Sequence, residues 1–192
     1  MILVISKMKY PNKTKLEYNK NISYANRGMD LENMINLTNQ YYLDTDRAVI
    51  YKKPTPIGIN KVKYNPTVII EKAYFKDHST LDYNGIYRGK YIEFDVKETK
   101  NKTSFTLSNI KTHQIIHLKK IIDHGGICFL IIKMNDTVFL LPGEELIQFI
   151  EINERKSIPN SYFVTNAHLV KYSYNPVLNY LDIIDKIYKE VL

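Results

Sequence analysis

Two short segments decide the fold: Ser79-Thr80-Leu81-Asp82-Tyr83-Asn84-Gly85 and Tyr91-Ile92-Glu93-Phe94-Asp95-Val96-Lys97. The first is rich in turn-forming residues and the second alternates apolar with polar side chains, which predicts a turn followed by a β-strand. Alternate side chains of a strand share a face. The three apolar residues of the strand are therefore expected in the core, and the three polar ones together on the opposite face: Glu93, Asp95 and Lys97.

An acid and a lysine two residues apart on one strand face, with a second acid from the preceding turn, can hold a hard divalent cation. Asp95, Lys97 and Asp82 supply these groups. Mg²⁺ prefers a few carboxylates, water and a substrate phosphate. Such a metal polarises a phosphate and lowers the pKa of bound water, while an ammonium stabilises the charge that develops on phosphorus. The alternative on spacing alone is an ordinary solvated strand face.

The charge of the chain points to a polyanionic partner. Its 192 residues are 44% hydrophobic and 24% charged, which fits one compact domain or one domain with an appendage. The net charge is +7, but residues 1–120 carry 21 lysines and arginines against 11 acids, while the remainder carries 6 against 9. A charge excess confined to one part of a chain is typical of nucleic-acid binding.

Composition excludes several other classes of protein. The single cysteine, Cys128, removes any internal disulfide framework and any cysteine-rich zinc site. The apolar runs are far shorter than the ~20 residues of a membrane span, and residues 1–5 lack the basic flank and cleavage site of a signal peptide. The sequence therefore predicts a soluble, cytoplasmic protein with no membrane partner.

Helical and strand patterns alternate along the chain. Residues 1–25 are polar and basic without a period, which predicts a flexible arm. Helices are expected at 28–42, 112–124, 142–150 and 176–191, strands at 48–51, 67–75 and 91–97, a turn-rich stretch at 77–89, and a hairpin at 127–134 and 137–141. Strands interleaved with helices predict an α/β fold with a mixed β-sheet core.

The segment Lys52–Pro66 differs from the rest of the chain. It contains three prolines, no acid and four lysines, namely Lys52, Lys53, Lys61 and Lys63. Proline at positions 54 and 56 opposes a helix or a central strand. We expect an extended basic projection that binds DNA, the alternative being a surface loop with solvated lysines.

Five runs of residues resemble the RecU family, in that family's order and spacing from about Asn26 to at least Ile132. They are Asn26-Arg27-Gly28-Met29, Ala48-Val49-Ile50-Tyr51-Lys52-Lys53-Pro54-Thr55-Pro56, Asp82-Tyr83-Asn84-Gly85, Lys97-Glu98-Thr99-Lys100-Asn101-Lys102-Thr103-Ser104-Phe105 and His113-Gln114-Ile115. RecU proteins are Holliday junction resolvases within the PD-(D/E)xK nuclease superfamily. The resemblance implies a restriction-endonuclease-like domain over residues 26–192, with a stalk at about 52–66 that projects from a dimer into the centre of the junction.

The resemblance also implies a role for each site residue. Thr80, Asp82, Asp95 and Gln114 match the family's Mg²⁺-binding positions, with Mn²⁺ as the alternative ion, and Lys97 matches its transition-state-stabilising lysine. The family usually has Glu-Ala-Lys where this chain has Asp95-Val96-Lys97, and often has His in place of Tyr51.

We therefore expect a Mg²⁺-dependent endonuclease that resolves four-way junctions by paired nicking during recombination and repair. The resemblance adds a homodimer, a RecA-type recombinase and branch-migration machinery as partners. Two alternatives stay open: a non-catalytic junction-binding protein that modulates a recombinase, and a PD-(D/E)xK nuclease that acts on linear duplex DNA.

A few further residues have two interpretations each. Arg27 is either a phosphate contact or part of a structural salt bridge, and Glu32 and Glu93 either assist the metal or do not. His113 and His117 have a spacing that can bind Zn²⁺, but they lack a third ligand on their helix, which favours packing or DNA positioning.

Overall fold

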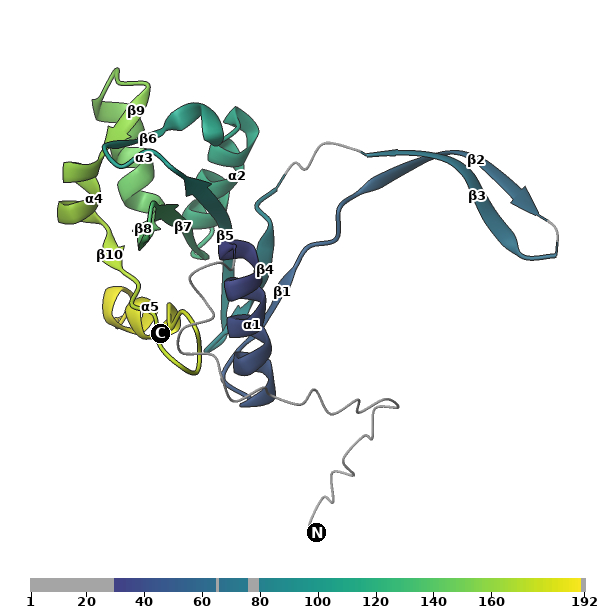
Figure 1. The fold of residues 1–192 in the computed structure, drawn as a ribbon, viewed down its shortest axis with the longest axis horizontal. Helices are drawn as coiled ribbons and strands as arrows, with labels where there is room; N and C mark the ends of the chain where they lie inside the picture. Colours follow the sequence, from purple (N-terminus) through teal and green to yellow (C-terminus); the bar gives the residue numbers. More distant parts are fainter. Residues whose placement is uncertain (1–29, 65, 76–79, 191–192) are drawn as a thin grey trace, which may run out of the picture.

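The computed structural model describes residues 30–64, 66–75 and 80–190, so the predicted arm at 1–25 and Arg27 lie outside the described residues. Within these ranges a six-stranded sheet forms the centre of the molecule (Figure 1), in the order β1-β4-β5-β7-β8-β10. The strands are β1 (Val49–Lys52), β4 (Tyr83–Tyr87), β5 (Lys90–Thr99), β7 (Ile127–Met134), β8 (Thr137–Pro142) and β10 (His168–Leu169). β5 and β7 run parallel, whereas the other neighbouring pairs run antiparallel.

A long crossover joins the two parallel strands, as such a pair requires. It contains β6 (Ser104–Thr106), the single-turn helix η2 (Leu107–Asn109) and α2 (Thr112–Asp123). β6 pairs with β9 (Ser157–Pro159) beside the main sheet. The α2 helix and the β7–β8 hairpin agree with the predicted ranges.

Helices cover both faces of the sheet. The helices α1 (Leu31–Asp44) and α5 (Leu181–Ile187) pack on one face, while α2, α3 (Gly143–Ile152) and α4 (Asn160–Asn166) pack in the hydrophobic core on the other. Phe94 of β5 stacks between Tyr83 and Phe129, with ring centroids 4.9 and 4.7 Å away. The predicted α/β fold with a mixed sheet flanked by helices is confirmed.

The α1 helix begins at a capping residue and buries one stripe. The Asp30 carboxylate accepts a hydrogen bond from the Asn33 N–H at 2.8 Å, which satisfies one of the free donors of the first turn. Met34, Thr38 and Tyr42 recur at helical spacing and are buried. The helix ends two residues later than the predicted range 28–42.

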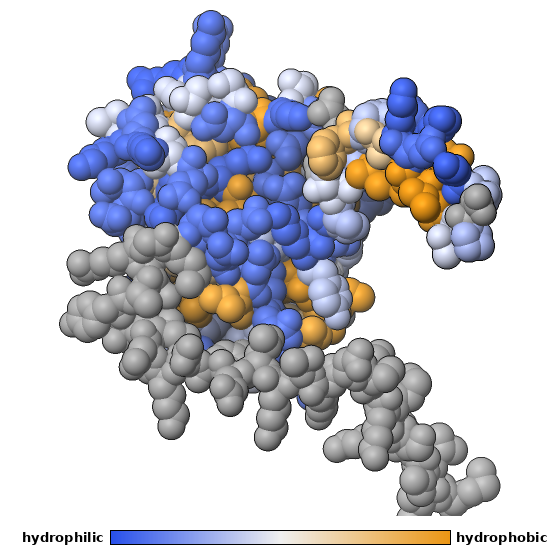
Figure 2. Space-filling model, turned by 45° about the vertical axis from the view of Figure 1, so that its right-hand side comes forward, coloured by the Kyte–Doolittle hydropathy of each residue, from blue (hydrophilic) through white to orange (hydrophobic). Residues whose placement is uncertain are grey.

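A two-stranded antiparallel hairpin projects from the domain (Figure 1), and we call it the stalk. It consists of β2 (Ile57–Tyr64) and β3 (Val68–Phe75). The stalk therefore extends further along the chain than the predicted range 52–66, because β3 pairs with β2 and not with the central sheet. Its apolar side chains gather on the surface (Figure 2), where Ile57, Ile59 and Ile69 are each about half exposed.

The predicted turn-rich stretch 77–89 was wrong in part, because it contains the strand β4. Tyr83 and Tyr87 are buried, and a Cβ at Gly85 would lie 2.0 Å from the Val49 carbonyl oxygen of β1. Asn84 and Gly85 between the two tyrosines are typical of turns, which is why the sequence suggested one here. The turn itself is Arg88-Gly89, both with positive φ, and it leads into β5.

The predicted C-terminal helix at 176–191 was also wrong in extent, since α5 covers only Leu181–Ile187. Val177 and Leu178 are buried from an irregular segment instead, and the Leu178 N–H donates to the Thr38 hydroxyl of α1.

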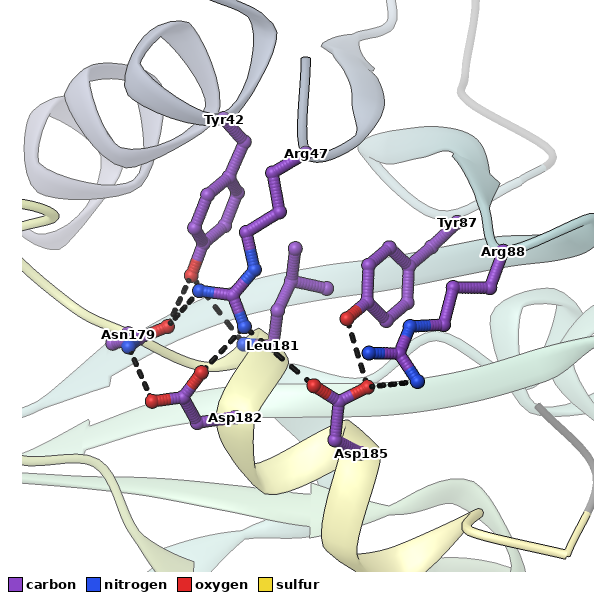
Figure 3. A network of polar contacts seen from close by, with 8 residues as sticks. All are labelled: Tyr42, Arg47, Tyr87, Arg88, Asn179, Leu181, Asp182 and Asp185. Atoms are coloured by element: carbon purple, nitrogen blue, oxygen red, sulfur yellow. Dashed lines mark hydrogen bonds and ion pairs between the residues drawn. The ribbon is translucent and has the colours of Figure 1, made fainter. Parts of the chain in front are cut away.

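Two acids of α5 fasten this helix to the rest of the domain (Figure 3). Asp182 pairs with Arg47, and Asp185 accepts a hydrogen bond from the Tyr87 hydroxyl at 2.8 Å. Arg88 also lies 3.5 Å from the Asp185 carboxylate. These contacts hold α5 against β4 and the loop after α1. No helix of the described part of the chain is long and apolar enough to cross a bilayer.

Candidate active site

Two acids lie opposite each other where β4 begins and β5 passes beside it. Tyr83 pairs with Phe94 in the antiparallel register, so the preceding Asp82 is placed opposite Asp95. The Asp82 carbonyl accepts a hydrogen bond from the Lys53 N–H at 2.7 Å, which fixes the backbone that carries this acid. The sheet therefore brings together two carboxylates that lie thirteen positions apart in the chain.

Asp95 is fully buried and its two oxygens receive different donors. Oδ2 lies 2.7 Å from the Lys97 Nζ and accepts a hydrogen bond from the Gln114 Nε2 at 2.8 Å. Oδ1 accepts the Val96 N–H at 2.8 Å. The side chains of Asp95 and Lys97 share a strand face as predicted, and Gln114 reaches them from the first turn of α2.

The surroundings of Asp95 oppose its negative charge. Burial raises the pKa of Asp95 to about 6, the Lys97 ammonium works against this rise, and the neighbouring Asp82 carboxyl adds to it by repulsion and by hydrogen bonding. A buried acid with a second carboxylate beside it is a suitable place for a cation, because a cation offsets the repulsion.

The donor set fits a hard divalent ion. Among the described residues, no cluster of three or more His, Cys, Asp or Glu side chains is placed to hold a metal. A cation beside Asp82 and Asp95 would therefore rely on two carboxylates, neutral oxygens and water, which is the set that Mg²⁺ prefers. In the arrangement described, the Gln114 Oε1 accepts from the Lys111 N–H at 3.1 Å, and its amide nitrogen faces Asp95.

Thr80 lies two residues before Asp82, at the start of the segment that leads into β4, and its side chain is half-buried. Of the residues predicted from the sequence, the structure thus brings together Asp82, Asp95, Lys97 and Gln114. Thr80 is near them in the chain, but among the described residues no hydrogen bond links its side chain to the two acids.

Glu93 occupies a position that sequence reasoning left open. Its carboxylate is completely buried and lies 2.5 Å from the Lys53 Nζ and 2.9 Å from the His117 Nε2. It also accepts the Leu81 N–H at 3.1 Å and the Tyr91 hydroxyl at 2.6 Å. Burial works against the charge, but the Lys53 ammonium, Tyr91 and His117 together hold the pKa of Glu93 below its usual value. The strand period placed Glu93 beside Asp95, whereas nothing in the sequence identified Lys53 as its partner.

The predicted DNA-binding lysines lie at the base of the stalk and along it. Lys52 pairs with Glu32 of α1 at 2.6 Å, and Lys61 pairs with Glu71 across the stalk at 2.6 Å. The Lys53 side chain is 20% exposed beside Glu93, and Lys63 is exposed on β2. Glu32 and Glu93 therefore contact lysines.

Comparison with known proteins gives consistent matches. The family model described as "Recombination protein U" matches residues 26–186. A Holliday junction resolvase RecU of Oceanobacillus iheyensis is 45% identical over 195 residues, which cover 94% of this chain and 100% of that protein. The RecU proteins of Geobacillus sp. strain WCH70 and Bacillus pumilus are 47% and 45% identical, covering 86% and 93% of this chain and 86% and 89% of their own lengths. Among solved structures, Hjc of Archaeoglobus fulgidus, a Holliday junction resolvase, aligns with a TM-score of 0.40 and 11% identity over 68% of this chain and 91% of its own.

Proposed function

Because the chain belongs to the RecU family, we propose that it is a junction-cleaving endonuclease, a Holliday junction resolvase that acts in recombination and repair. The match over residues 26–186 and the 45% identity of relatives along almost the whole chain confirm the resemblance seen in the motifs. The observation that carries the proposal is the pairing of Asp82 with Asp95, with the Lys97 ammonium 2.7 Å from the buried acid.

We propose that Asp82 and Asp95 hold a Mg²⁺ ion, with Thr80 as a further oxygen donor and Gln114 as another once its Oε1 turns from the Lys111 N–H toward the ion. When bound, such an ion polarises the phosphate and makes the attacking water more acidic. Burial and the neighbouring Asp82 raise the pKa of Asp95, so a cation at this position would favour its ionised form. Mn²⁺ would satisfy the same donor set.

Lys97 has a separate task in this proposal. Its ammonium lies on the site face of β5 with 21% of the side chain exposed, so it can contact a phosphate without leaving Asp95. A fixed positive charge beside the reacting phosphorus stabilises the negative charge that develops there. Asp82, Asp95 and Lys97 are thus the proposed catalytic residues.

The stalk supplies the proposed contact with the centre of a four-way junction. It projects from the domain (Figure 1) and carries Lys61, Lys63 and Lys72 in sixteen strand residues. Lysines on an extended hairpin bind phosphates at close range without reading sequence. Lys52 and Lys53 at its base, and Arg27, complete the predicted DNA-binding set.

We further propose that the protein acts as a homodimer. The stalk exposes Ile57, Ile59 and Ile69 by 48, 52 and 51%, and exposed apolar side chains in a group indicate a surface that is covered by a partner. A two-fold dimer also presents two sites to the two strands that must be cut. A RecA-type recombinase and branch-migration machinery are further proposed partners in the cytoplasm.

Cleavage of matched DNA substrates tests the proposal. Equimolar four-way junction and linear duplex of the same arm sequence are incubated with Mg²⁺ and either the unaltered chain or Asp82→Asn. We expect cleavage of the junction by the unaltered chain alone. Equal cutting of both substrates would favour a nuclease of linear duplex, and junction binding without cutting by either protein would favour a non-catalytic binding module.

A further inference from the structure

Glu93 contacts the two residues of the domain that flank the stalk in the chain, Lys53 before it and Leu81 after it. We call the segments at these two residues the outgoing and the returning leg. We infer that Glu93 is a positioning residue: it clamps both legs onto β5, so that the base of the stalk and the placement of Asp82 opposite Asp95 are set together. The inference rests on the proposed function and deepens it, because it assigns a role at the same site to a residue outside the predicted catalytic set.

The outgoing leg is held through Lys53. This residue follows β1 directly, and β2 of the stalk begins four residues later at Ile57. Its ammonium lies 2.5 Å from Glu93, and its backbone N–H donates to the Asp82 carbonyl at 2.7 Å. A displacement of the outgoing leg at Lys53 would therefore act on both Glu93 and Asp82.

The returning leg is held through Leu81. The stalk ends at Phe75, and six residues later the Leu81 N–H donates to the same Glu93 oxygen at 3.1 Å. Leu81 is buried and directly precedes Asp82. Glu93 thus fixes the backbone beside one metal-site acid while standing two residues from the other on β5.

Two further contacts anchor the clamp to the domain. The Tyr91 hydroxyl donates to the second Glu93 oxygen at 2.6 Å, and His117 of α2 lies 2.9 Å from the first. His117 is three residues from Gln114, which contacts Asp95. This accounts for His117 as a packing residue of the clamp.

The charge of Glu93 is essential to this arrangement. A buried carboxylate is stable only when opposite charge and hydrogen-bond donors surround it, and removing it leaves the buried partner charge uncompensated. In Glu93→Gln the size is kept, but the amide nitrogen would face an N–H or O–H donor, and the Lys53 ammonium would lose its counter-charge.

Kinetics give the first test. For Glu93→Gln we expect kcat for junction cleavage to fall roughly 10- to 30-fold, as for other residues that orient metal ligands, and the Mg²⁺ concentration for half-maximal cleavage to rise. Junction affinity measured in Ca²⁺ should fall less than kcat does, because Glu93 lies inside the domain and acts on the junction only through the stalk. The double variant Lys53→Gln, Glu93→Gln should lose no more kcat than the less active of the two single variants, since the two residues act as one unit.

Hydrogen exchange of the DNA-free protein gives a test that does not depend on cleavage. Glu93→Gln should accelerate exchange about tenfold or more at Lys53 and at Leu81 and Asp82, with β7 unchanged. The matched control is Glu98→Gln, which removes a half-exposed carboxylate of the same strand that pairs with Lys133 at 2.9 Å. Its exchange at the two legs should remain that of the unaltered chain.

Unchanged kcat with unchanged exchange at both legs would overturn the clamp. So would faster exchange that is uniform across the sheet, because that pattern describes general destabilisation. If the unaltered chain fails to cut junctions, the proposed function fails, yet the exchange pattern still decides whether Glu93 holds the two legs.

Discussion

The replacement of Asp95 by Asn should stabilise the metal-free protein while it removes one ligand of the proposed metal site. The Asp95 side chain is 0% exposed, and burial raises its pKa from 3.8 to about 6, with Lys97 opposing and Asp82 reinforcing the rise. A carboxyl group whose pKa is raised on folding contributes stability below its unfolded pKa and loses it as pH rises through the folded pKa. The unaltered chain therefore bears the full cost of a buried, crowded charge above pH 6.

The size of the effect follows from the shift. About two pKa units correspond to about 3 kcal/mol, at about 1.4 kcal/mol per unit. Asn has nearly the same shape and no charge, so this cost of about 3 kcal/mol is absent from Asp95→Asn. Its amide nitrogen would however face one of the donors that Asp95 accepts, which costs about 1–2 kcal/mol. The net gain at pH 7.5 should therefore be about 1–2 kcal/mol, which for a chain of this length is a rise in Tm of roughly 2–8 °C. The advantage should shrink by about 1.4 kcal/mol at pH 5, where the folded carboxyl is mostly protonated.

Urea denaturation in EDTA at pH 7.5, 6.0 and 5.0 measures these differences. The same free energy of unfolding is then measured at increasing Mg²⁺ concentration. A bound cation should stabilise the unaltered chain, whereas the stability of Asp95→Asn should not change. An Asn variant that is less stable than the unaltered chain at pH 7.5, or a difference that does not vary with pH, would refute the reasoning.

Three further changes test other parts of the account. Lys97→Met should lower kcat for junction cleavage about 100-fold or more at nearly unchanged junction affinity, because the ammonium that stabilises the charge developing on the phosphate is lost. Single-turnover cleavage rates measure this, and a rate within threefold of the unaltered chain would contradict it. The double variant Lys61→Gln, Lys63→Gln should weaken junction binding and reduce the slope of log affinity against log salt by about 1–2. Binding titrations between 50 and 200 mM salt measure this slope, and an unchanged slope would contradict a phosphate contact by these lysines. Gly85→Ala places a Cβ 2.0 Å from the Val49 carbonyl oxygen, so it should separate β1 from β4 and lower the free energy of unfolding by about 1–3 kcal/mol. Urea denaturation measures this, and a midpoint equal to that of the unaltered chain would contradict it.

The sequence was most informative where a local period coincides with the tertiary environment. Residues 92–97 of β5 alternate between apolar and polar, so the strand and the shared face of Asp95 and Lys97 could be predicted. The hairpin around Asn135 follows from turn chemistry, and its positive φ is the conformation that Asn tolerates.

Elements that depend on distant partners were not predictable in the same way. Residues 68–75 form a strand as expected, but only the pairing with β2 shows that the strand belongs to the stalk. The buried segment at Val177 and Leu178 has helical spacing, and its backbone is fixed instead by a contact with Thr38, 140 positions earlier.

In the candidate site, too, some residues could be predicted from the local sequence and others only from the fold. Asp82, Asp95 and Lys97 could be proposed from motif and spacing, because they lie close together in the chain, one directly before β4 and two on β5. The function of Glu93 required the fold, since Lys53 lies 40 residues away and becomes its partner only when β1, β4 and β5 pair. A basic residue in a basic segment was expected to contact DNA, and the structure shows it beside a buried carboxylate.

Paired cleavage of a plasmid that extrudes a cruciform is the most direct test of the central claim. Two metal-dependent sites that act on one junction should convert the supercoiled plasmid to a linear product in Mg²⁺, and a matched plasmid without the cruciform should remain intact. Asp82→Asn should give neither result. Nicked circles alone, or linear product from both plasmids, would contradict the account.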